Sequence, residues 1–166
     1  MTVRRAVGAD AHVLTALNLF VHEMHLARRP DYFKPVRADD VAAWFRERLE
    51  ERTTAAWIAE TEGRPVGYVL TFFHERGEDA FRRPRRWCEI DQIAVDPGWR
   101  RRGVGRALMA AALAEADSRG VDAELFSWAF NTDAHAMFRR LGFEPRMLRF
   151  ERRAPQRRRG LAGGTL

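Results

Sequence analysis

Two glycines lie among arginines at the start of an expected helix, in the segment DPGWRRRGVGRAL that begins at Asp96. Glycine inside a helix costs about 1 kcal/mol relative to alanine, so its use twice here needs a reason. The first backbone N–H groups of a helix have no partner within it, and the helix dipole adds partial positive charge at that end. Glycine lets an anion approach this backbone without a Cβ in the way. We therefore interpret Gly103 and Gly105 as part of a phosphate-binding turn.

The spacing of the glycines excludes two other phosphate motifs. A Walker loop needs a glycine followed directly by lysine, and the single lysine of the chain is Lys34 in another segment. A dinucleotide-binding fingerprint needs a third glycine three residues after Gly105, where Leu108 stands. The remaining alternative is that the two glycines only form a tight turn beneath a basic surface.

The hydrophobic patterns on either side of this turn predict the elements that position it. The order β-α-α-β-β-β-α-β-α-β indicates an α/β fold whose sheet has a parallel pair and antiparallel neighbours. The expected strands span about residues 2–7, 54–61, 65–73, 87–95, 121–130 and 143–152, and the expected helices span about residues 11–28, 39–51, 104–119 and 132–141.

The composition is typical of a globular protein in water. The chain has 166 residues, 46% hydrophobic and 31% charged, which is enough for one domain with a core. No apolar run approaches the roughly 20 residues that span a bilayer, and the first residues lack the apolar stretch of a signal peptide. The single cysteine, Cys88, cannot form an internal disulfide. We therefore expect a cytoplasmic protein without a membrane partner.

The net charge of +6 is concentrated at the C-terminus. Five of these charges belong to arginines beyond Glu151, in the acid-free stretch RRAPQRRRGLAGGTL. We expect a single domain over residues 1–151, followed by an Arg/Gly-rich, disordered tail over residues 152–166. A nucleic-acid-binding protein is a weaker interpretation, because residues 1–151 carry neither zinc-ligand spacing nor an RNP motif.

The glycine turn and a later segment together resemble a known family. The hexapeptide RRRGVG, residues 100–105, resembles the [Gln/Arg]-x-x-Gly-x-[Gly/Ala] signature of GNAT-superfamily acyltransferases, and IDQIAVDPGWRRRGVGRAL is similar to their strand, turn and helix. The segment NTDAHAMFRRLGFEP resembles a second family segment, with Asn131, Ala134 and LGF at the family spacing. The resemblance covers about residues 2–150. It implies the GNAT fold, a central mixed, mostly antiparallel sheet with a splayed parallel pair, flanked by helices.

The resemblance implies acetyl-CoA as the acetyl donor and no metal. The pantetheine arm would fill the gap between the splayed strands and bond to main-chain groups near Ile93 and Val95, as an extended ligand pairs with a sheet edge. Backbone N–H groups after the strand would hold the phosphates. Asn131 would bond near the pantetheine, and Phe138 would pack beside the thioester. The implied contacts are Ile93, Ala94, Val95, Arg100, Arg101, Arg102, Gly103, Val104, Gly105, Arg106, Asn131 and Phe138.

Two carboxylates in the strand before the turn are candidate general bases. An amine with a pKa near 10 must lose a proton before it attacks a thioester. In a regular strand Glu89, Asp91, Ile93 and Val95 share one face, which would place both acids on the face of the pantetheine-bonding positions. Each acid matches a position where some family members have a proposed base, and two acids in one cleft raise one pKa. We favour Glu89 over Asp91; the alternative is that one acid pairs with an arginine such as Arg82 or Arg86.

The sequence departs from the family on the side of the leaving group. Many members have a tyrosine seven residues after the asparagine, proposed to protonate the CoA thiolate, and this position is Phe138. His135 or Tyr68 could supply the proton instead, or the thiolate leaves unaided. The general acid is therefore unassigned.

The loop RRPDYFKPV, between two prolines, corresponds to the family segment that usually shapes acceptor specificity. Tyr32 and Phe33 in this loop are the candidate substrate-binding residues. His22 and His25 lie one helical turn apart without an evident third ligand, so no metal site is expected.

Residues and resemblance together predict an acetyl-CoA-dependent N-acetyltransferase that acts on a primary amine of a small molecule, peptide or protein. The alternative is a non-catalytic acyl-CoA-binding or sensing module, for which Phe138 is the best support. Homodimers are common among the resembling proteins, but nothing in this sequence decides the oligomeric state. The sequence does not identify the acceptor.

Overall fold

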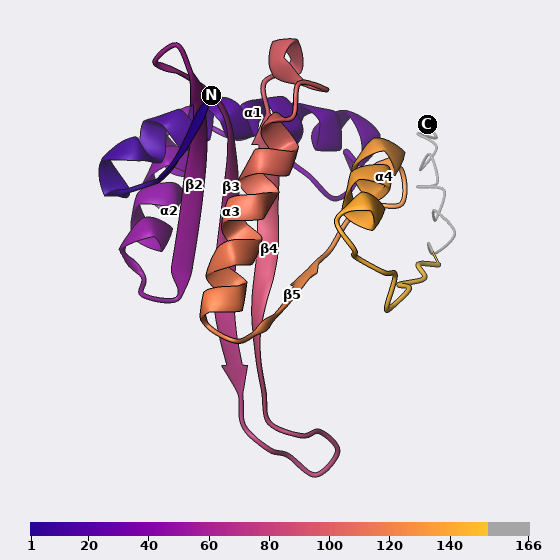
Figure 1. Cartoon of the computed structure of the whole chain (residues 1–166). Helices are drawn as coiled ribbons and strands as arrows, with labels where there is room; N and C mark the ends of the chain where they lie inside the picture. Colours follow the sequence, from indigo (N-terminus) through magenta and orange to yellow (C-terminus); the bar gives the residue numbers. More distant parts are fainter. Residues whose placement is uncertain (153–166) are drawn as a thin grey trace, which may run out of the picture.

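A five-stranded sheet forms the centre of the structure, a computed structural model that describes residues 1–152 (Figure 1). The strands lie in sequence order across the sheet: β1 (Thr2–Arg5), β2 (Thr54–Thr61), β3 (Arg64–Arg76), β4 (Arg85–Val95) and β5 (Asp122–Leu125). The first four pair antiparallel, and β4 and β5 are parallel. The expected mixed, mostly antiparallel sheet is confirmed. Residues 153–166, almost all of the expected disordered tail, lie outside the described part of the chain.

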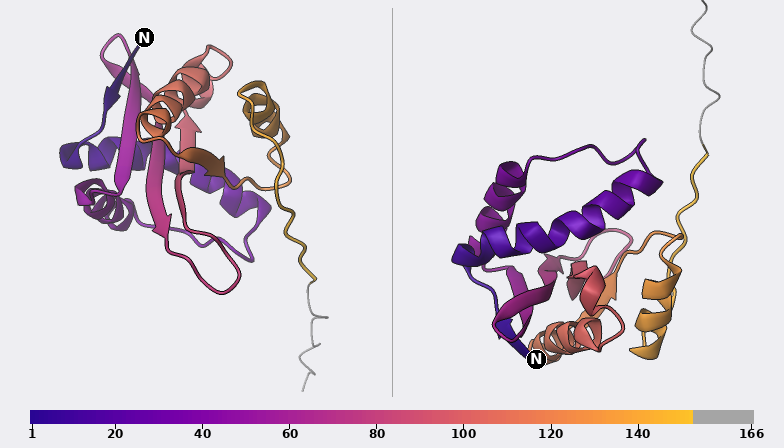
Figure 2. Two further views of the ribbon diagram at one scale, coloured as in Figure 1. Left: turned by 60° about the horizontal axis from the view of Figure 1, so that its bottom comes forward. Right: turned by 90° about the horizontal axis from the view of Figure 1, so that it is seen from above.

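Helices cover both faces of the sheet. Helices α1 (Ala11–Arg28) and α2 (Ala38–Glu50) lie on one face, and α3 (Val104–Ser118) and α4 (Thr132–Arg140) lie on the other, as the view from above shows (Figure 2). Short 3-10 turns, Gly8–Asp10 and Pro97–Trp99, precede α1 and α3. We call the two sides of the sheet the α1 face and the α3 face.

Both faces of the middle strands are buried, which explains their nearly continuous apolar sequences. Tyr68 and Leu70 of β3 lie in the core beneath α1 and α2, whereas Val69 between them lies in the core beneath α3. This alternation follows the period of two of an extended strand. Leu14 of α1 and Leu108 of α3 are fully buried. Burial of each such side chain contributes about 1.5–3 kcal/mol, so two cores hold the sheet in place beneath the candidate site.

A β-bulge interrupts the pairing of β3 with β4. Leu70 pairs with Gln92, and the next residue of β3, Thr71, pairs with Ile90. Asp91 is therefore an extra residue of β4 with no partner on β3. Such an insertion shifts the alternation of side chains on one side of it relative to the other.

The bulge changes which way Glu89 faces. Glu89 lies opposite Phe72, which packs on the α1 face, whereas Ile93 lies opposite Val69 on the α3 face. The regular alternation that the sequence suggests does not hold across the bulge. The sequence predicts one strand face that carries Glu89, Asp91, Ile93 and Val95. This prediction is therefore wrong.

Strands β4 and β5 separate before β4 ends. Their parallel pairing runs from Trp87 and Asp122 to Ile90 and Leu125, although β4 continues to Val95. Residues 91–95 thus have no strand on their β5 side within the described part of the chain. The expected splayed parallel pair is confirmed.

The element order departs from expectation after α4. No strand follows α4 among residues 141–152, although the sequence predicts one over residues 143–152, and β5 ends at Leu125 instead of about residue 130. Pro145 has no N–H to donate to a ladder, and β5 offers only four residues with which to pair. Met147, Leu148 and Phe150 are all largely exposed instead of packed. The sixth strand is thus absent from the described residues, while the preceding elements follow the predicted order.

Candidate active site

The turn before α3 depends on backbone conformations that suit glycine. Gly103, which precedes the helix, has a φ of 85°, and a Cβ there would meet no atom within 4 Å. Arg101 also has a positive φ, of 61°. A residue with a side chain adopts this left-handed conformation at a cost of roughly 1–2 kcal/mol. The chain therefore adopts the left-handed conformation twice within three residues, immediately before α3 begins at Val104.

Gly105 is required for a different reason, which is space. A Cβ on Gly105 would lie 3.2 Å from Sδ of Met137, 3.8 Å from Cγ2 of Val95 and 4.0 Å from Cδ1 of Ile93. The first turn of α3 therefore lies against both α4 and the end of β4. A larger side chain at Gly105 would fill this junction, beside the backbone N–H groups of the first helical turn.

Exposed arginines surround the same turn. Arg100 donates from Nε to the carbonyl of Val95 at 3.3 Å, and the guanidinium of Arg102 lies 5.2 Å from the ring centre of Trp99. Their positive charge adds to that of the helix dipole, which makes the turn suitable for an anion. The features of the turn therefore fit the phosphates of CoA. The exposed arginines are Arg100, Arg101, Arg102 and Arg106.

The end of β4 fits an extended ligand. Alternate backbone N–H and C=O groups of residues 91–95 point away from β3, toward the gap that opens where β5 diverges. Ile93 and Val95 lie against the α3-face core, and Ala94 is buried on the other face. A strand edge without a neighbouring strand pairs with extended ligands through its main chain, which is what the pantetheine arm of CoA requires.

Glu89 contacts His74 on the α1 face. Its Oε2 atom lies 3.1 Å from Nε2 of His74, with the two side chains 22% and 37% exposed. His74 in turn stacks on Trp87, with ring centroids 4.9 Å apart. The hairpin register places His74 directly opposite Trp87, so β3 and β4 bring these three side chains together. Arg82, an alternative partner considered from the sequence, pairs with Asp79 at 2.7 Å instead.

Asp91 is the carboxylate whose environment most favours a base. Although it reaches the surface, partial burial raises the pKa of Asp91 above its ordinary value, and repulsion from Glu89 raises it further. A hydrogen bond with Gln92 and the nearby His74 act in the opposite direction. A raised pKa makes a carboxylate a better proton acceptor at neutral pH. The expectation that two neighbouring acids raise one pKa agrees with this direction.

The two alternative proton donors lie in different parts of the site. Tyr68 is fully buried on the α1 face, where its hydroxyl donates to Oε1 of Gln92 at 2.6 Å and accepts from Nδ2 of Asn18 at 2.8 Å. Burial raises the pKa of Tyr68 well above its ordinary value, so this phenol keeps its proton. His135 lies on α4, with Nε2 3.1 Å from Oγ of Ser127 in the loop that follows β5.

The last two predicted CoA contacts lie in α4 and in the residue that precedes it. Asn131 precedes the helix, where its N–H donates to the carbonyl of Trp128 at 2.9 Å and its carbonyl accepts from the N–H of His135 at 3.1 Å. Phe138 is 8% exposed and packs in the α3-face core, with its ring centroid 6.1 Å from that of Phe143. Phe138 therefore acts as a core side chain, and it has no proton to donate.

The predicted acceptor loop between α1 and α2 meets the loop between β5 and α4. The ring centroid of Trp128 lies 5.1 Å from that of Tyr32 and 5.6 Å from that of Phe33, the two candidate substrate-binding residues. Phe130 stacks on Trp128 at 5.9 Å, and His25 of α1 stacks on Phe33 at 5.1 Å. We call these five residues the aromatic cluster. The cluster joins two loops that are far apart along the chain.

The sequence interpretation missed His74 and Trp128. His74 lies just beyond the expected end of a strand at residue 73, and a hairpin drawn three residues longer would have placed it opposite Trp87. Trp128 falls in an apolar run that is expected to continue β5, but the strand ends at Leu125. No pattern in the sequence links Trp128 to Phe33, which is far away along the chain.

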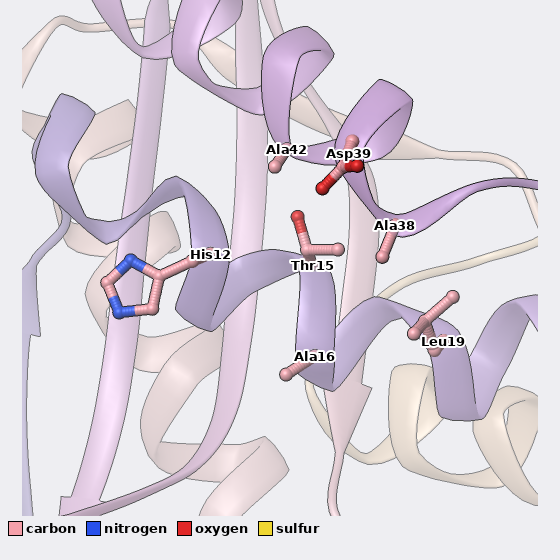
Figure 3. A pocket seen from close by; sticks show the side chains of 7 residues that line it. All are labelled: His12, Thr15, Ala16, Leu19, Ala38, Asp39 and Ala42. Atoms are coloured by element: carbon pink, nitrogen blue, oxygen red, sulfur yellow. The ribbon is translucent and has the colours of Figure 1, made fainter.

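A pocket between α1 and α2 lies apart from these residues (Figure 3). The hydroxyl of Thr15 in this pocket donates to the carbonyl of Ala11 at 2.8 Å, so the same hydrogen does not donate to a ligand in the pocket. Among residues 1–152, no three His, Cys, Asp or Glu side chains are grouped to hold a metal, and no helix is long and apolar enough to cross a membrane. The pocket is lined by His12, Thr15, Ala16, Leu19, Ala38, Asp39 and Ala42.

Comparison with known proteins decides the family. Residues 21–143 match the family model described as the acetyltransferase (GNAT) family. The chain belongs to the GNAT family. This GNAT protein is 31% identical over 137 residues to a mycothiol acetyltransferase of Amycolatopsis mediterranei (strain U-32), an alignment that covers 82% of this chain and 43% of the relative. The chain therefore spans less than half the length of that relative.

Solved structures share the GNAT fold. The BH1408 protein of Bacillus halodurans, in a tetramutant form, superposes with a TM-score of 0.87 at 21% identity, over 93% of this chain and 100% of that one. Aminoglycoside N-acetyltransferase AAC(6')-Iy in complex with CoA gives a TM-score of 0.69 at 21% identity, over 92% and 95% of the two chains. At this identity the likeness shows the fold alone.

Proposed function

We propose that this GNAT protein transfers the acetyl group of acetyl-CoA to a primary amine. The observation that carries the proposal is the meeting, at one end of the sheet, of the free edge of β4 with the glycine turn that begins α3. An extended ligand that bears phosphates needs both features, because its arm pairs with a strand and its phosphates bind backbone N–H groups. A turn that bound only a small anion would not need the free edge.

The residues at this end of the sheet hold the donor in the proposed reaction. Bound acetyl-CoA supplies the thioester carbonyl that the amine attacks. The main chain of Ile93 and Val95 orients its arm, and the turn from Arg100 to Arg106 neutralises its phosphates. The crowding around Gly105 brings α4 against the same junction, so the donor is held between α3, α4 and β4.

Glu89 and Asp91 remove the amine proton in this proposal. The two carboxylates attract a protonated amine to the α1 face, and the one with the raised pKa, Asp91, is the better proton acceptor. The contact of Glu89 with His74 offers the proton a further acceptor near the surface. The name of one relative supports nitrogen as the accepting atom, since an uncharacterized N-acetyltransferase of Methanocaldococcus jannaschii is 33% identical over 123 residues.

The leaving thiolate receives no proton from Phe138. The proton of Tyr68 is held by Gln92 at 2.6 Å, which makes Tyr68 a poor donor. The thiolate therefore leaves unaided or takes a proton from His135. A His135→Ala variant distinguishes these routes, because only the second predicts a lower kcat at neutral pH with an unchanged KM for acetyl-CoA.

The experiment that tests donor binding is thermal denaturation with and without acetyl-CoA. A ligand at 100 times its Kd stabilises the native state by about 2.7 kcal/mol. We expect acetyl-CoA to raise the Tm of the wild type. It should not raise the Tm of Gly103→Glu, because this variant adds a negative charge at the turn. Gly77→Glu is the matched control, because Gly77 lies in the β3–β4 loop and a Cβ there meets no atom within 4 Å. An equal rise in Tm with acetyl-CoA in Gly103→Glu and Gly77→Glu would contradict the proposed phosphate site.

A non-catalytic acyl-CoA-binding module is the second candidate, and the burial of Phe138 favours it. Such a module would show the same thermal shift with acetyl-CoA. It would release no CoA when primary amines are added, whereas an N-acetyltransferase releases one thiol for each amine acetylated. A thiol-release assay with a panel of amines therefore separates the two functions.

A further inference from the structure

One side of α1 connects the carboxylates to the aromatic cluster. Asn18, His22 and His25 are four and three residues apart in turn, so they project from the same side of the helix. Asn18 donates to Oε1 of Gln92 at 3.1 Å, and Gln92 directly follows Asp91 in β4. The side of α1 that faces the carboxylates therefore continues along the helix toward the acceptor loop.

The rise of α1 gives the distance along its axis from Asn18 to the residues that contact the aromatic cluster. With a rise of 1.5 Å per residue, His22 lies about 6 Å and His25 about 10 Å along the axis from Asn18. The ring of His22 lies 6.0 Å from that of Phe33, and that of His25 lies 6.0 Å from that of Phe130. The aromatic cluster therefore lies one to two helical turns along α1 from Asn18, which contacts Gln92 beside Asp91.

Arginines already lie against the cluster. The guanidinium of Arg29 lies 4.9 Å from the ring centre of Trp128 and 5.8 Å from that of Tyr32, and the guanidinium of Arg28 lies 6.0 Å from that of Phe130. Arg29 is held in place by ion pairs, one of them with Asp31 at 2.9 Å. Since these guanidinium groups take up cation–π positions, the ring surface that remains suits an uncharged, planar group better than a second cation.

We infer that the acceptor is a primary amine joined by a short linker to an uncharged planar ring. The inference rests on the proposed function. The amine lies at Glu89 and Asp91, and the ring packs against the aromatic cluster, which begins one to two turns of α1 beyond Asn18. Tyr32, at 64% exposure, is the member of the cluster most open to such a ring.

The test compares amines in a steady-state thiol-release assay. Phenylalkylamines with linkers of two to four carbons are the ring-bearing probes, and n-butylamine, spermidine and glucosamine are the comparison amines. We expect kcat/KM for the best phenylalkylamine to exceed that for n-butylamine at least tenfold. Equal values, or a preference for spermidine or glucosamine, would overturn the inference while leaving the proposed N-acetyltransferase function intact.

Variants locate the preference in the cluster. Tyr32→Ala and Trp128→Ala should each lower the ratio of kcat/KM for the phenylalkylamine to that for n-butylamine about tenfold, chiefly through KM. Phe81→Ala is the control, because Phe81 is 96% exposed in the loop that projects from β3 and β4 (Figure 1). An unchanged ratio in Tyr32→Ala, whose exposed side chain can be removed without disturbing a core, would overturn the assignment. Absence of transfer to every amine, with the acetyl-CoA thermal shift retained, would overturn the proposed function itself.

Discussion

The raised pKa of Asp91 means that its ionised form destabilises the folded protein. Because the folded-state pKa lies above the ordinary value, this penalty is present at neutral pH. The penalty disappears as the pH falls below the ordinary value of about 3.9, where the group is protonated in both states. We therefore expect Asp91→Asn to have a higher Tm than the wild type at pH 7, with the difference shrinking toward pH 4. Thermal unfolding followed by circular dichroism at several pH values measures this difference; a lower Tm at pH 7 would contradict it.

Ionisation of Asp10 should have the opposite effect, because it stabilises the folded protein. Arg4 donates two hydrogen bonds to Asp10, at 2.8 and 2.9 Å, and these bonds are the main reason that the pKa of Asp10 is lowered. Its stabilising effect is therefore present above the ordinary carboxyl pKa and is lost as the pH falls through the folded-state value. Asp10→Asn should lower the free energy of unfolding by about 1.5–3 kcal/mol at pH 7, the usual contribution of hydrogen bonds to a charged group. Urea unfolding at pH 7 and pH 3 checks this, and an equal loss at both would argue against it.

At the scale of elements, the two glycines of the α3 turn should respond differently to alanine. Gly103→Ala forces a side chain into the left-handed region, so we expect a loss of roughly 1 kcal/mol in stability. Gly105→Ala improves helix propensity by about 1 kcal/mol, and its Cβ meets the flexible end of Met137. Gly105→Ala should therefore keep its Tm, and its Kd for acetyl-CoA should change little because the family signature accepts alanine at this position. Paired denaturation and calorimetric titration of both variants test this, and a Tm lowered as much in Gly105→Ala as in Gly103→Ala would contradict it.

The elements also show how far sequence reasoning extends. The strand, turn and helix around Gly103 follow from local patterns, because capping and periodicity are properties of neighbouring residues. The bulge at Asp91 does not, since it is defined by the pairing of β4 with β3. Local patterns therefore identify Glu89 and Asp91 as candidates but assign them to the wrong face.

The sequence misses the aromatic cluster and wrongly predicts a last strand for the same reason. Trp128 and Phe33 meet through the placement of two loops, which no local pattern encodes. The stretch from Phe143 onward has apolar residues suited to a strand, but whether it pairs depends on the length of β5, which is set by where β5 diverges from β4. Local propensity is a weak guide where tertiary pairing decides.

At the scale of the whole molecule, the bulge and the splay divide the proposed reaction between the two faces of the sheet. The turn, Gly105 and α4 lie with the α3 face, Glu89 lies with the α1 face, and the aromatic cluster joins the α1–α2 loop to the loop before α4. A regular β4 would have placed the acids beside the donor-binding side chains. The gap where β5 leaves β4 is the place at which an acceptor on one face and a donor on the other can meet.

This division predicts that CoA binding slows the hydrogen exchange of backbone amides in particular segments only. If the arm of CoA pairs with the free edge of β4, backbone amides of residues 91–95 and of the first turn of α3 should exchange with deuterium at least tenfold more slowly in its presence. Amides of α2 lie on the far face and should change little. Hydrogen exchange followed by mass spectrometry, with Gly103→Glu as the non-binding control, measures both regions. Slowing spread evenly over the chain would indicate general stabilisation and would contradict pairing at β4, because an edge-pairing ligand protects the strand it joins before it protects the rest of the fold.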